Sequence, residues 1–181
     1  MGTRATPRLV LLNGPAGVGK STLARRYAAE HPLTLALEID GLRGMLGAWL
    51  DEPQESGLAA RALAIAAADT HLRRGHDVLV PQLLTRREFV EELRRTAEAA
   101  GASFVELTLM DERAAVLERV HAREDPPGGF SARALAAKQG GSLGGAYDRF
   151  SEALSERPDA IVIDAASQDR AYADLLRLLE K

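Results

Sequence analysis

The stretch "RLVLLNGPAGVGKST", residues 8–22, decides the fold of this chain. Its first six residues form an apolar run that Gly14-Pro15 interrupts, which is typical of a buried β-strand that ends in a loop. The residues from Lys20 to Glu30 predict a helix. Between strand and helix, "GPAGVGKS" matches the pattern G-x-x-x-x-G-K-[S/T] at every fixed position.

Each residue type in this loop has a physical role in holding phosphate. The glycines let the backbone turn tightly and aim N–H groups at phosphate oxygens, and the helix start adds its positive dipole end. Lys20 can reach the β- and γ-phosphates, and the Ser21 hydroxyl can ligate Mg²⁺. A glycine-rich turn without nucleotide is the alternative, which the strict match disfavours. The predicted nucleoside triphosphate site comprises Gly14, Pro15, Ala16, Gly17, Val18, Gly19, Lys20, Ser21 and Thr22.

Apolar runs and helical segments alternate along the rest of the chain. We predict further strands at residues 33–39, 77–82, 103–110 and 160–164, and further helices at residues 56–74, 86–100, 112–123 and 172–179. Residues 125–145, rich in proline and glycine, are predicted to be irregular. This alternation predicts an α/β fold of three layers, in which helices cover both faces of a five-stranded parallel sheet. We expect residues 1–181 to form one domain.

Composition excludes several classes of function. The chain has no cysteine, so disulfides, thiolate metal sites and thiol catalysis are ruled out. Its formal net charge of −3 gives no global attraction to nucleic acid. No apolar run has the length of a membrane span or of a signal peptide, so we expect a cytoplasmic protein without a membrane partner.

The second predicted strand ends in an acid, Asp40, and Arg43 follows three residues later. Parallel strands end at the same edge of a sheet, where ligands bind in such folds, so Asp40 is expected near the γ-phosphate. A carboxylate there can act as a general base on a substrate hydroxyl. Aspartate is also a good helix N-cap, and the two roles are compatible.

The third predicted strand ends in Gln82, where an acid that positions Mg²⁺ and water is usual in phosphate-loop motors and switches. Asp77 lies at the opposite end of that strand. The missing acid disfavours a motor ATPase or a switch GTPase. Gln82 can donate and accept hydrogen bonds, so it suits a polar acceptor substrate, although a polar residue that merely ends a strand is the alternative.

The segments "LVLLNGPAGVGKST" and "LEIDGLRGML" resemble the small phosphate-loop kinases, a group that includes chloramphenicol phosphotransferase, adenylylsulfate kinase, gluconate kinase and shikimate kinase. The resemblance implies that Asp40 accepts or orients the proton of an acceptor hydroxyl and that Arg43 holds a substrate anion. It also implies that Arg119 and Arg123 contact the ATP phosphates at the start of a mobile lid, residues 124–145. Surface ion pairs with neighbouring acids are the alternative for both arginines.

These features together predict an ATP- and Mg²⁺-dependent kinase that phosphorylates a hydroxyl of a small molecule, with Lys20, Asp40 and Arg123 as catalytic residues. Asp40, Arg43 and Gln82 are the predicted acceptor-binding residues. A nucleotide-binding regulatory protein or slow NTPase is one alternative, and a nucleic-acid end kinase is another that the charge and the scarcity of aromatic residues disfavour. Apolar residues after Asp40 either line the acceptor pocket or pack in the core: Leu42, Met45, Leu46, Trp49 and Leu50.

Overall fold

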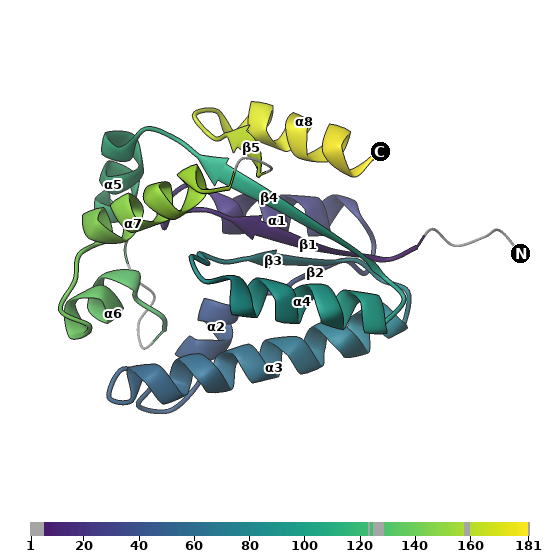
Figure 1. Ribbon diagram of the computed structural model, residues 1–181, viewed down its shortest axis with the longest axis horizontal. Coiled ribbons are helices and arrows are strands. Elements are labelled where there is room, and N and C mark those ends of the chain that lie inside the picture. The colour runs from purple at the N-terminus through teal and green to yellow at the C-terminus, as the bar shows by residue number, and fades with distance from the viewer. Residues whose placement is uncertain (1–5, 123, 125–128, 158–159, 181) are drawn as a thin grey trace, which may run out of the picture.

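A computed structural model describes residues 6–122, 124, 129–157 and 160–180. Within them, five strands form one sheet in the order β2-β3-β1-β4-β5, and every neighbouring pair is parallel (Figure 1). The predicted five-stranded parallel sheet is therefore confirmed. The strands are β1 (Arg8–Asn13), β2 (Leu35–Ala36), β3 (Val78–Pro81), β4 (Ser103–Met110) and β5 (Ile161–Asp164).

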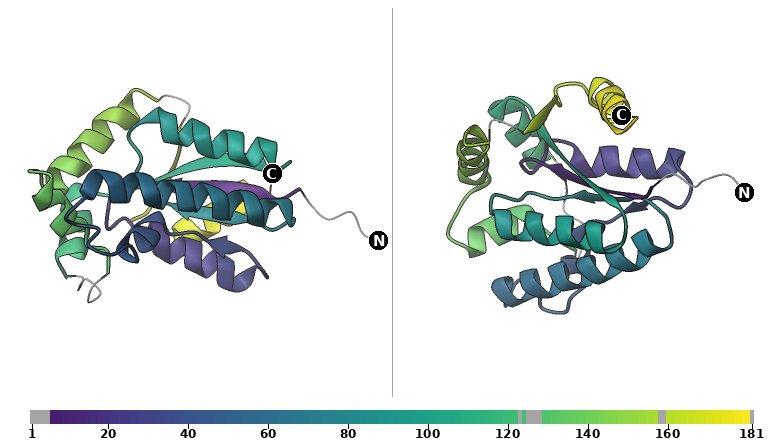
Figure 2. Two further views of the ribbon diagram at one scale, coloured as in Figure 1. Left: turned by 90° about the horizontal axis from the view of Figure 1, so that it is seen from below. Right: turned by 45° about the vertical axis from the view of Figure 1, so that its right-hand side comes forward.

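Helices cover both faces of the sheet and give the predicted three layers (Figure 2). None of the helices among the described residues has the length and apolar character needed to cross a membrane. The helices are α1 (Lys20–Glu30), α2 (Ile39–Gly44), α3 (Pro53–Arg73), α4 (Arg87–Ala99), α5 (Arg113–Ala122), α6 (Ala132–Lys138), α7 (Leu143–Ser155) and α8 (Gln168–Leu179).

The alternation of side chains along β1 builds two hydrophobic cores. Leu9 and Leu11 point to the face covered by α3 and α4, and Val10 and Leu12 point to the face covered by α1 and α8. All four side chains are fully buried. A strand buried on both faces must be apolar throughout, which explains the uninterrupted run that precedes the loop.

The ends of the central strands are level with one another. Leu12 pairs with Pro81 on one side of β1, and Asn13 pairs with Thr108 on the other. The segments that follow β1, β2, β3 and β4 therefore leave the sheet at one edge. In Figure 1, helices α5, α6 and α7 gather at the end of the molecule opposite to the N-terminus.

The second strand is much shorter than predicted. Residues 33–39 suggested a full strand, but β2 comprises Leu35 and Ala36 alone, and Ile39 already begins α2. The main chain still follows β3 a little further, since Leu37 donates a hydrogen bond to the Leu79 carbonyl at 2.8 Å. The apolar side chains of Leu37 and Ile39 are buried in the core whether or not the backbone is extended, so the apolar run overstated the strand.

The prediction that residues 125–145 are irregular is wrong for the described part of this segment. Ala132–Lys138 forms α6, whose N-cap Ser131 accepts a hydrogen bond from Ala134 N at 3.0 Å. Helix α7 then begins at Leu143 behind a second serine cap, Ser142. The serine caps and the alanine run favour helix here, and the glycines lie mainly around the turns.

The core of the α3–α4 face can be tested on two leucines of neighbouring helices. Leu93 on α4 is fully buried, whereas Leu63 on α3 is 49% exposed. We expect Leu93→Ala to lower the free energy of unfolding by about 2–5 kcal/mol, because the substitution removes buried surface and leaves a cavity. Leu63→Ala should change it by less than about 0.5 kcal/mol. Urea denaturation measures both, and equal losses would contradict the assigned packing.

Candidate active site

The loop between β1 and α1 is held closely by its neighbours. Gly17 has a φ angle of 86°, a backbone conformation that side chains disfavour. A Cβ atom at this position would lie 2.2 Å from Val120 Cγ2 and 2.8 Å from the Val116 carbonyl oxygen of α5. Gly19 faces the carboxamide of Gln168, the first residue of α8, in the same way. The glycines therefore allow a tight turn and also let α5 and α8 pack against the loop.

Lys20 is buried over the loop that precedes it. Its ammonium group donates hydrogen bonds to the carbonyl oxygens of Gly14 at 2.9 Å and Pro15 at 2.8 Å. Burial lowers the pKa of Lys20 from 10.5 to about 8, although the negative charge of Asp40 opposes this shift. A depression of this size favours the neutral amine by roughly 3 kcal/mol relative to solvent. The structure therefore holds a costly positive charge where the phosphate-loop pattern predicts phosphate.

Asp40 lies in the first turn of α2, at the sheet edge shared with the phosphate loop. The N-cap of this helix is Glu38, so the interpretation of Asp40 as the cap residue is wrong. Gln82, which follows β3 directly, donates a hydrogen bond from Nε2 to Asp40 Oδ1 at 3.3 Å. Burial raises the pKa of Asp40, while the bond from Gln82 and the charge of Lys20 lower it. The structure thus brings three of the predicted site residues together.

Arg43 is buried one turn further along α2, and its guanidinium is engaged within the protein. Nε donates to Ser56 Oγ at 3.0 Å, and Nη2 donates to the Pro53 carbonyl. Its carbon Cζ lies 5.7 Å from the centre of the Trp49 ring. Burial lowers the pKa of this arginine, and the charge of Asp40 opposes that shift. These contacts bind the start of α3 to α2.

Arg119 reaches the phosphate loop from α5. Its Nε donates to the Gly17 carbonyl at 3.1 Å, and its Nη2 forms an ion pair with Asp111 at 2.5 Å. Asp111 directly follows β4, so the strand-end argument that selected Asp40 applies equally to this acid, which the sequence analysis did not single out. Arg123, the predicted catalytic arginine of the lid, lies outside the described residues.

Asn13 is a second residue that the sequence analysis missed. Its side chain is fully buried at the end of β1, and Oδ1 accepts hydrogen bonds from Gly14 N and Leu84 N, both at 2.9 Å. Its Nδ2 donates to the Leu84 carbonyl at 3.0 Å and to Glu106 Oε1 at 3.1 Å. This side chain fixes the start of the phosphate loop to the segment that carries Gln82. A polar residue that ends an otherwise apolar strand was the available signal.

An aromatic contact joins the α2–α3 connection to the predicted lid. The rings of Trp49 and Phe130 lie 5.3 Å apart between centroids. Phe130 approaches the end of α2 so closely that a Cβ atom on Gly44 would lie 2.5 Å from Phe130 N. Trp49 is 8% exposed and Met45 is 81% exposed, so the apolar residues after Asp40 do not share one environment. The described part of the predicted lid segment therefore contacts the element that carries Asp40.

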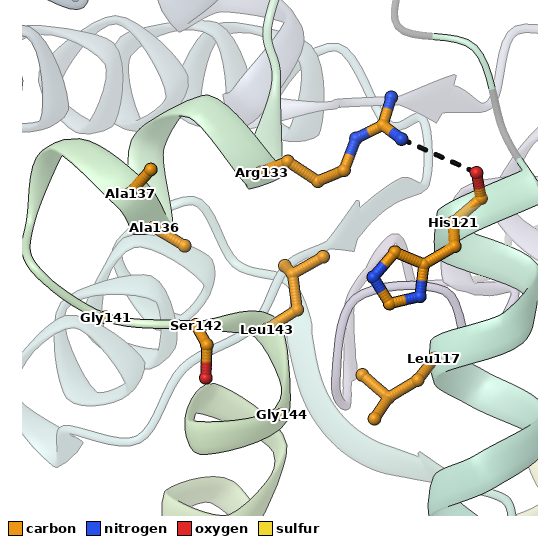
Figure 3. A pocket seen from close by; sticks show the side chains of 9 residues that line it. All are labelled: Leu117, His121, Arg133, Ala136, Ala137, Gly141, Ser142, Leu143 and Gly144. Carbon is orange, nitrogen blue, oxygen red and sulfur yellow. Dashed lines mark hydrogen bonds between the residues drawn. The ribbon is translucent and has the colours of Figure 1, made fainter.

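A separate open cavity of about 310 Å³ lies between α5, α6 and α7 (Figure 3). Its lining is mainly apolar, and Arg133 extends from α6 toward α5, where it donates to the His121 carbonyl at 3.5 Å. Leu117 and His121 lie one position beyond Val116 and Val120, which pack against the phosphate loop. The cavity is thus formed by α5, α6 and α7 beside the candidate site.

The donor set at the start of α1 fits a magnesium ion. Ser21 is the residue after Lys20, its side chain is partly exposed, and a hydroxyl oxygen is a ligand that Mg²⁺ accepts. Mg²⁺ usually keeps several waters and binds few protein groups beside substrate phosphates. Ser21 would hold the ion at this position, and Asp40 on the same edge could reach it through water.

The comparisons with known proteins identify the class. The chain belongs to the family described as AAA domain, whose model matches residues 9–140, and it has a nucleotide-binding P-loop kinase fold. A gluconokinase from Sinorhizobium meliloti is similar to it, with 20% identity, a TM-score of 0.57, and 98% of this chain and 96% of that chain covered. No curated protein matches the chain.

Two further solved structures show how broadly this fold is used. The tunicamycin resistance protein of Deinococcus radiodurans has 20% identity and a TM-score of 0.61, with 96% of this chain and 95% of that chain covered. A chain of the Pnkp1/Rnl/Hen1 RNA repair complex has 16% identity and a TM-score of 0.64, with 86% of this chain and 47% of that chain covered. At such identities the likeness shows the fold, so the acceptor must be argued from the site.

The lowered pKa of Lys20 predicts proton uptake when nucleotide binds. Near pH 8 part of the Lys20 population is neutral, and neighbouring phosphate charge should raise the pKa and draw in a proton. Calorimetric titration of MgATP in buffers of different ionisation enthalpy measures this uptake. It should fade toward roughly pH 7, where the amine is already charged. Lys20→Arg is the control, because a guanidinium stays protonated throughout, and wild-type binding without uptake near pH 8 would contradict the assignment.

Proposed function

We propose that the protein is an ATP-dependent kinase that transfers the γ-phosphoryl group to a hydroxyl of a small molecule. The observation that carries this proposal is the placement of Asp40, a partly buried carboxylate that is electrostatically coupled to Lys20 of the phosphate loop. A nucleotide-binding protein that only binds nucleotide has no evident use for a carboxylate at this point.

The proposed mechanism assigns one task to each group. The loop N–H groups and Lys20 bind the phosphates, and Mg²⁺ held at Ser21 supplies further charge neutralisation. Asp40 accepts the proton of the acceptor hydroxyl, whose oxygen attacks the γ-phosphorus while the bond to the β-phosphate oxygen breaks. Burial raises the pKa of Asp40, which makes its carboxylate a stronger base than an exposed aspartate. Arg119 stabilises charge on the transferred group from the α5 side of the loop.

The two remaining candidates differ in what they require of the site. A slow NTPase needs only water near Asp40, and it would release phosphate from ATP at a rate that added alcohols do not change. The alternative of a nucleic-acid end kinase has one observation in its favour, because a chain of an RNA repair complex shares the fold of this protein. However, the net charge of −3 and the apolar lining of the lid cavity give a polynucleotide little to bind.

Asp40→Asn tests the proposed base. We expect MgATP affinity to change only a few-fold, because Asn keeps the shape, while phosphoryl transfer falls roughly 10²- to 10⁴-fold. The assay follows ATP-dependent mass gain of one phosphate across a panel of neutral and anionic alcohols. Asp51→Asn, at an exposed acid beyond α2, is the matched control. Full turnover in Asp40→Asn would rule Asp40 out as the base.

The same proposal predicts a pH dependence. Because Asp40 must be ionised to accept a proton, kcat should fall as pH decreases through its raised pKa. This acidic limb should be absent from the residual activity of Asp40→Asn.

Arg119→Ala tests the contact between α5 and the bound phosphates. Loss of the guanidinium should raise KM for ATP about 10-fold, because charge-assisted hydrogen bonds to phosphate contribute roughly 1.5–3 kcal/mol. Arg113→Ala is the control on the same helix, since Arg113 pairs with Asp148 of α7 and not with the loop. Steady-state kinetics at varied ATP compares the two variants. Equal effects would show that Arg119 acts only by stabilising the fold.

A further inference from the structure

The carboxamide of Gln82 has one satisfied end and one unsatisfied end. Its Nε2 donates to Asp40 Oδ1, but its Oε1 is buried and has no hydrogen-bond donor among the described residues. The main chain of Gln82 is fixed, because its N–H donates to the Leu12 carbonyl at 3.0 Å. The side chain is therefore held beside Asp40, and its Oε1 atom is left to accept a further hydrogen bond.

An unsatisfied buried carbonyl is costly. The desolvation of such a group is not repaid when it has no partner, and buried polar atoms in native proteins nearly always have one. An apolar side chain of similar size would avoid the cost while still closing the end of β3. The unsatisfied oxygen therefore indicates a donor that arrives with a ligand.

The position of this oxygen limits what the donor can be. Oε1 and Nε2 share one carbon atom, and Nε2 is directed at the Asp40 carboxylate, so the site presents two neighbouring acceptors. The last torsion angle of glutamine is soft, so the carboxamide can adjust its orientation when a ligand arrives. A ligand that matches both acceptors carries two donors on adjacent atoms.

The charged residues of the site also limit the charge that the acceptor can carry. Arg43, the cation nearest to Asp40 on α2, already donates from Nε and Nη2 to Ser56 and Pro53. Arg43 is 8% exposed as a residue, and its guanidinium contacts the Pro53 carbonyl and the Trp49 ring. An anionic group on the acceptor would therefore lie beside the Asp40 carboxylate without a dedicated partner on α2, which favours a neutral acceptor.

From these contacts we infer that the acceptor is a neutral vicinal diol or 2-acylamino alcohol, the arrangement found in sugars, polyols and ribosides. One hydroxyl bonds to Asp40 and receives the phosphoryl group, and the adjacent O–H or N–H donates to Gln82 Oε1. The inference rests on the kinase function proposed above and names the substrate class of the same site.

The reaction balances without another reactant. The reacting hydroxyl gives its proton to Asp40, its oxygen forms the new P–O bond, and ADP leaves with the electron pair of the broken bond. Asp40 then releases the proton to solvent. The second hydroxyl or the amide is chemically unchanged, so Gln82 acts in positioning and specificity.

The test uses matched pairs of neutral alcohols with MgATP and the full chain. Uridine, D-ribose, D-glucose and 2-acetamido-2-deoxyglucose are each compared with an analogue that lacks the neighbouring donor, and phosphate gain is followed by mass spectrometry. We expect kcat/KM to fall about 10- to 100-fold when the neighbouring donor is removed, because Oε1 is then buried without a partner.

Gln82→Met separates specificity from folding. Methionine fills a similar volume without a carbonyl, so the melting temperature should stay the same or rise. The variant should lose most of the discrimination between a diol and its deoxy analogue. Gln82→Glu keeps an acceptor oxygen and should retain the discrimination even if its overall rate is lower.

The outcomes distinguish this inference from the kinase proposal beneath it. Isolated alcohols that gain phosphate as fast as their diol partners would overturn the inference and leave the kinase function intact, with a bound water as the partner of Oε1. Unchanged discrimination in Gln82→Met would overturn it as well. If no alcohol gains phosphate although MgATP binds, both proposals fail.

Discussion

The ammonium group of Lys20 constrains the rest of the structure. It is buried against the carbonyl oxygens of Gly14 and Pro15, and its burial lowers its pKa to about 8. Such a charge can be kept only in a turn whose backbone curls around it, and Gly17 supplies that turn at a positive φ angle. The loop can curl in this way because β1 ends level with its neighbours and Asn13 ties its start to the β3–α4 segment. The positions of the central strand, the phosphate loop and the site residues therefore depend on one another.

The second half of the site is coupled to the first by charge. Burial raises the pKa of Asp40 and lowers that of Lys20, and each charge partly offsets the shift of the other. Bound phosphates would attract the Lys20 ammonium and weaken its electrostatic interaction with Asp40. Nucleotide binding and the basicity of the Asp40 carboxylate are therefore linked. Gln82 joins this pair through its bond to Asp40, and it does so from a position where related folds often place an acid.

The sequence predicted those parts of the structure that follow from strong local rules. Strand β1, strand β4 and helix α1 have the predicted bounds, because long apolar runs and a strict loop pattern leave few alternatives. The length of β2 was not predictable, since Leu37 and Ile39 are buried in either conformation. Helices α6 and α7 were not predicted, because the many glycine and proline residues of this segment are a stronger local signal than its two serine caps. The engagement of Arg43 by Ser56 depends on how α3 packs against α2, which local sequence does not encode.

In the proposed kinase, Asp40 and the γ-phosphate face each other across a space that holds one hydroxyl group. A crystal structure with Mg²⁺ and a non-hydrolysable ATP analogue measures this directly. We expect a position at which one oxygen lies about 3 Å from both the Asp40 carboxylate and the γ-phosphorus, and we expect Lys20 to move from the Gly14 carbonyl onto the phosphates. A γ-phosphate that lies against α5 and out of reach of Asp40 would contradict it.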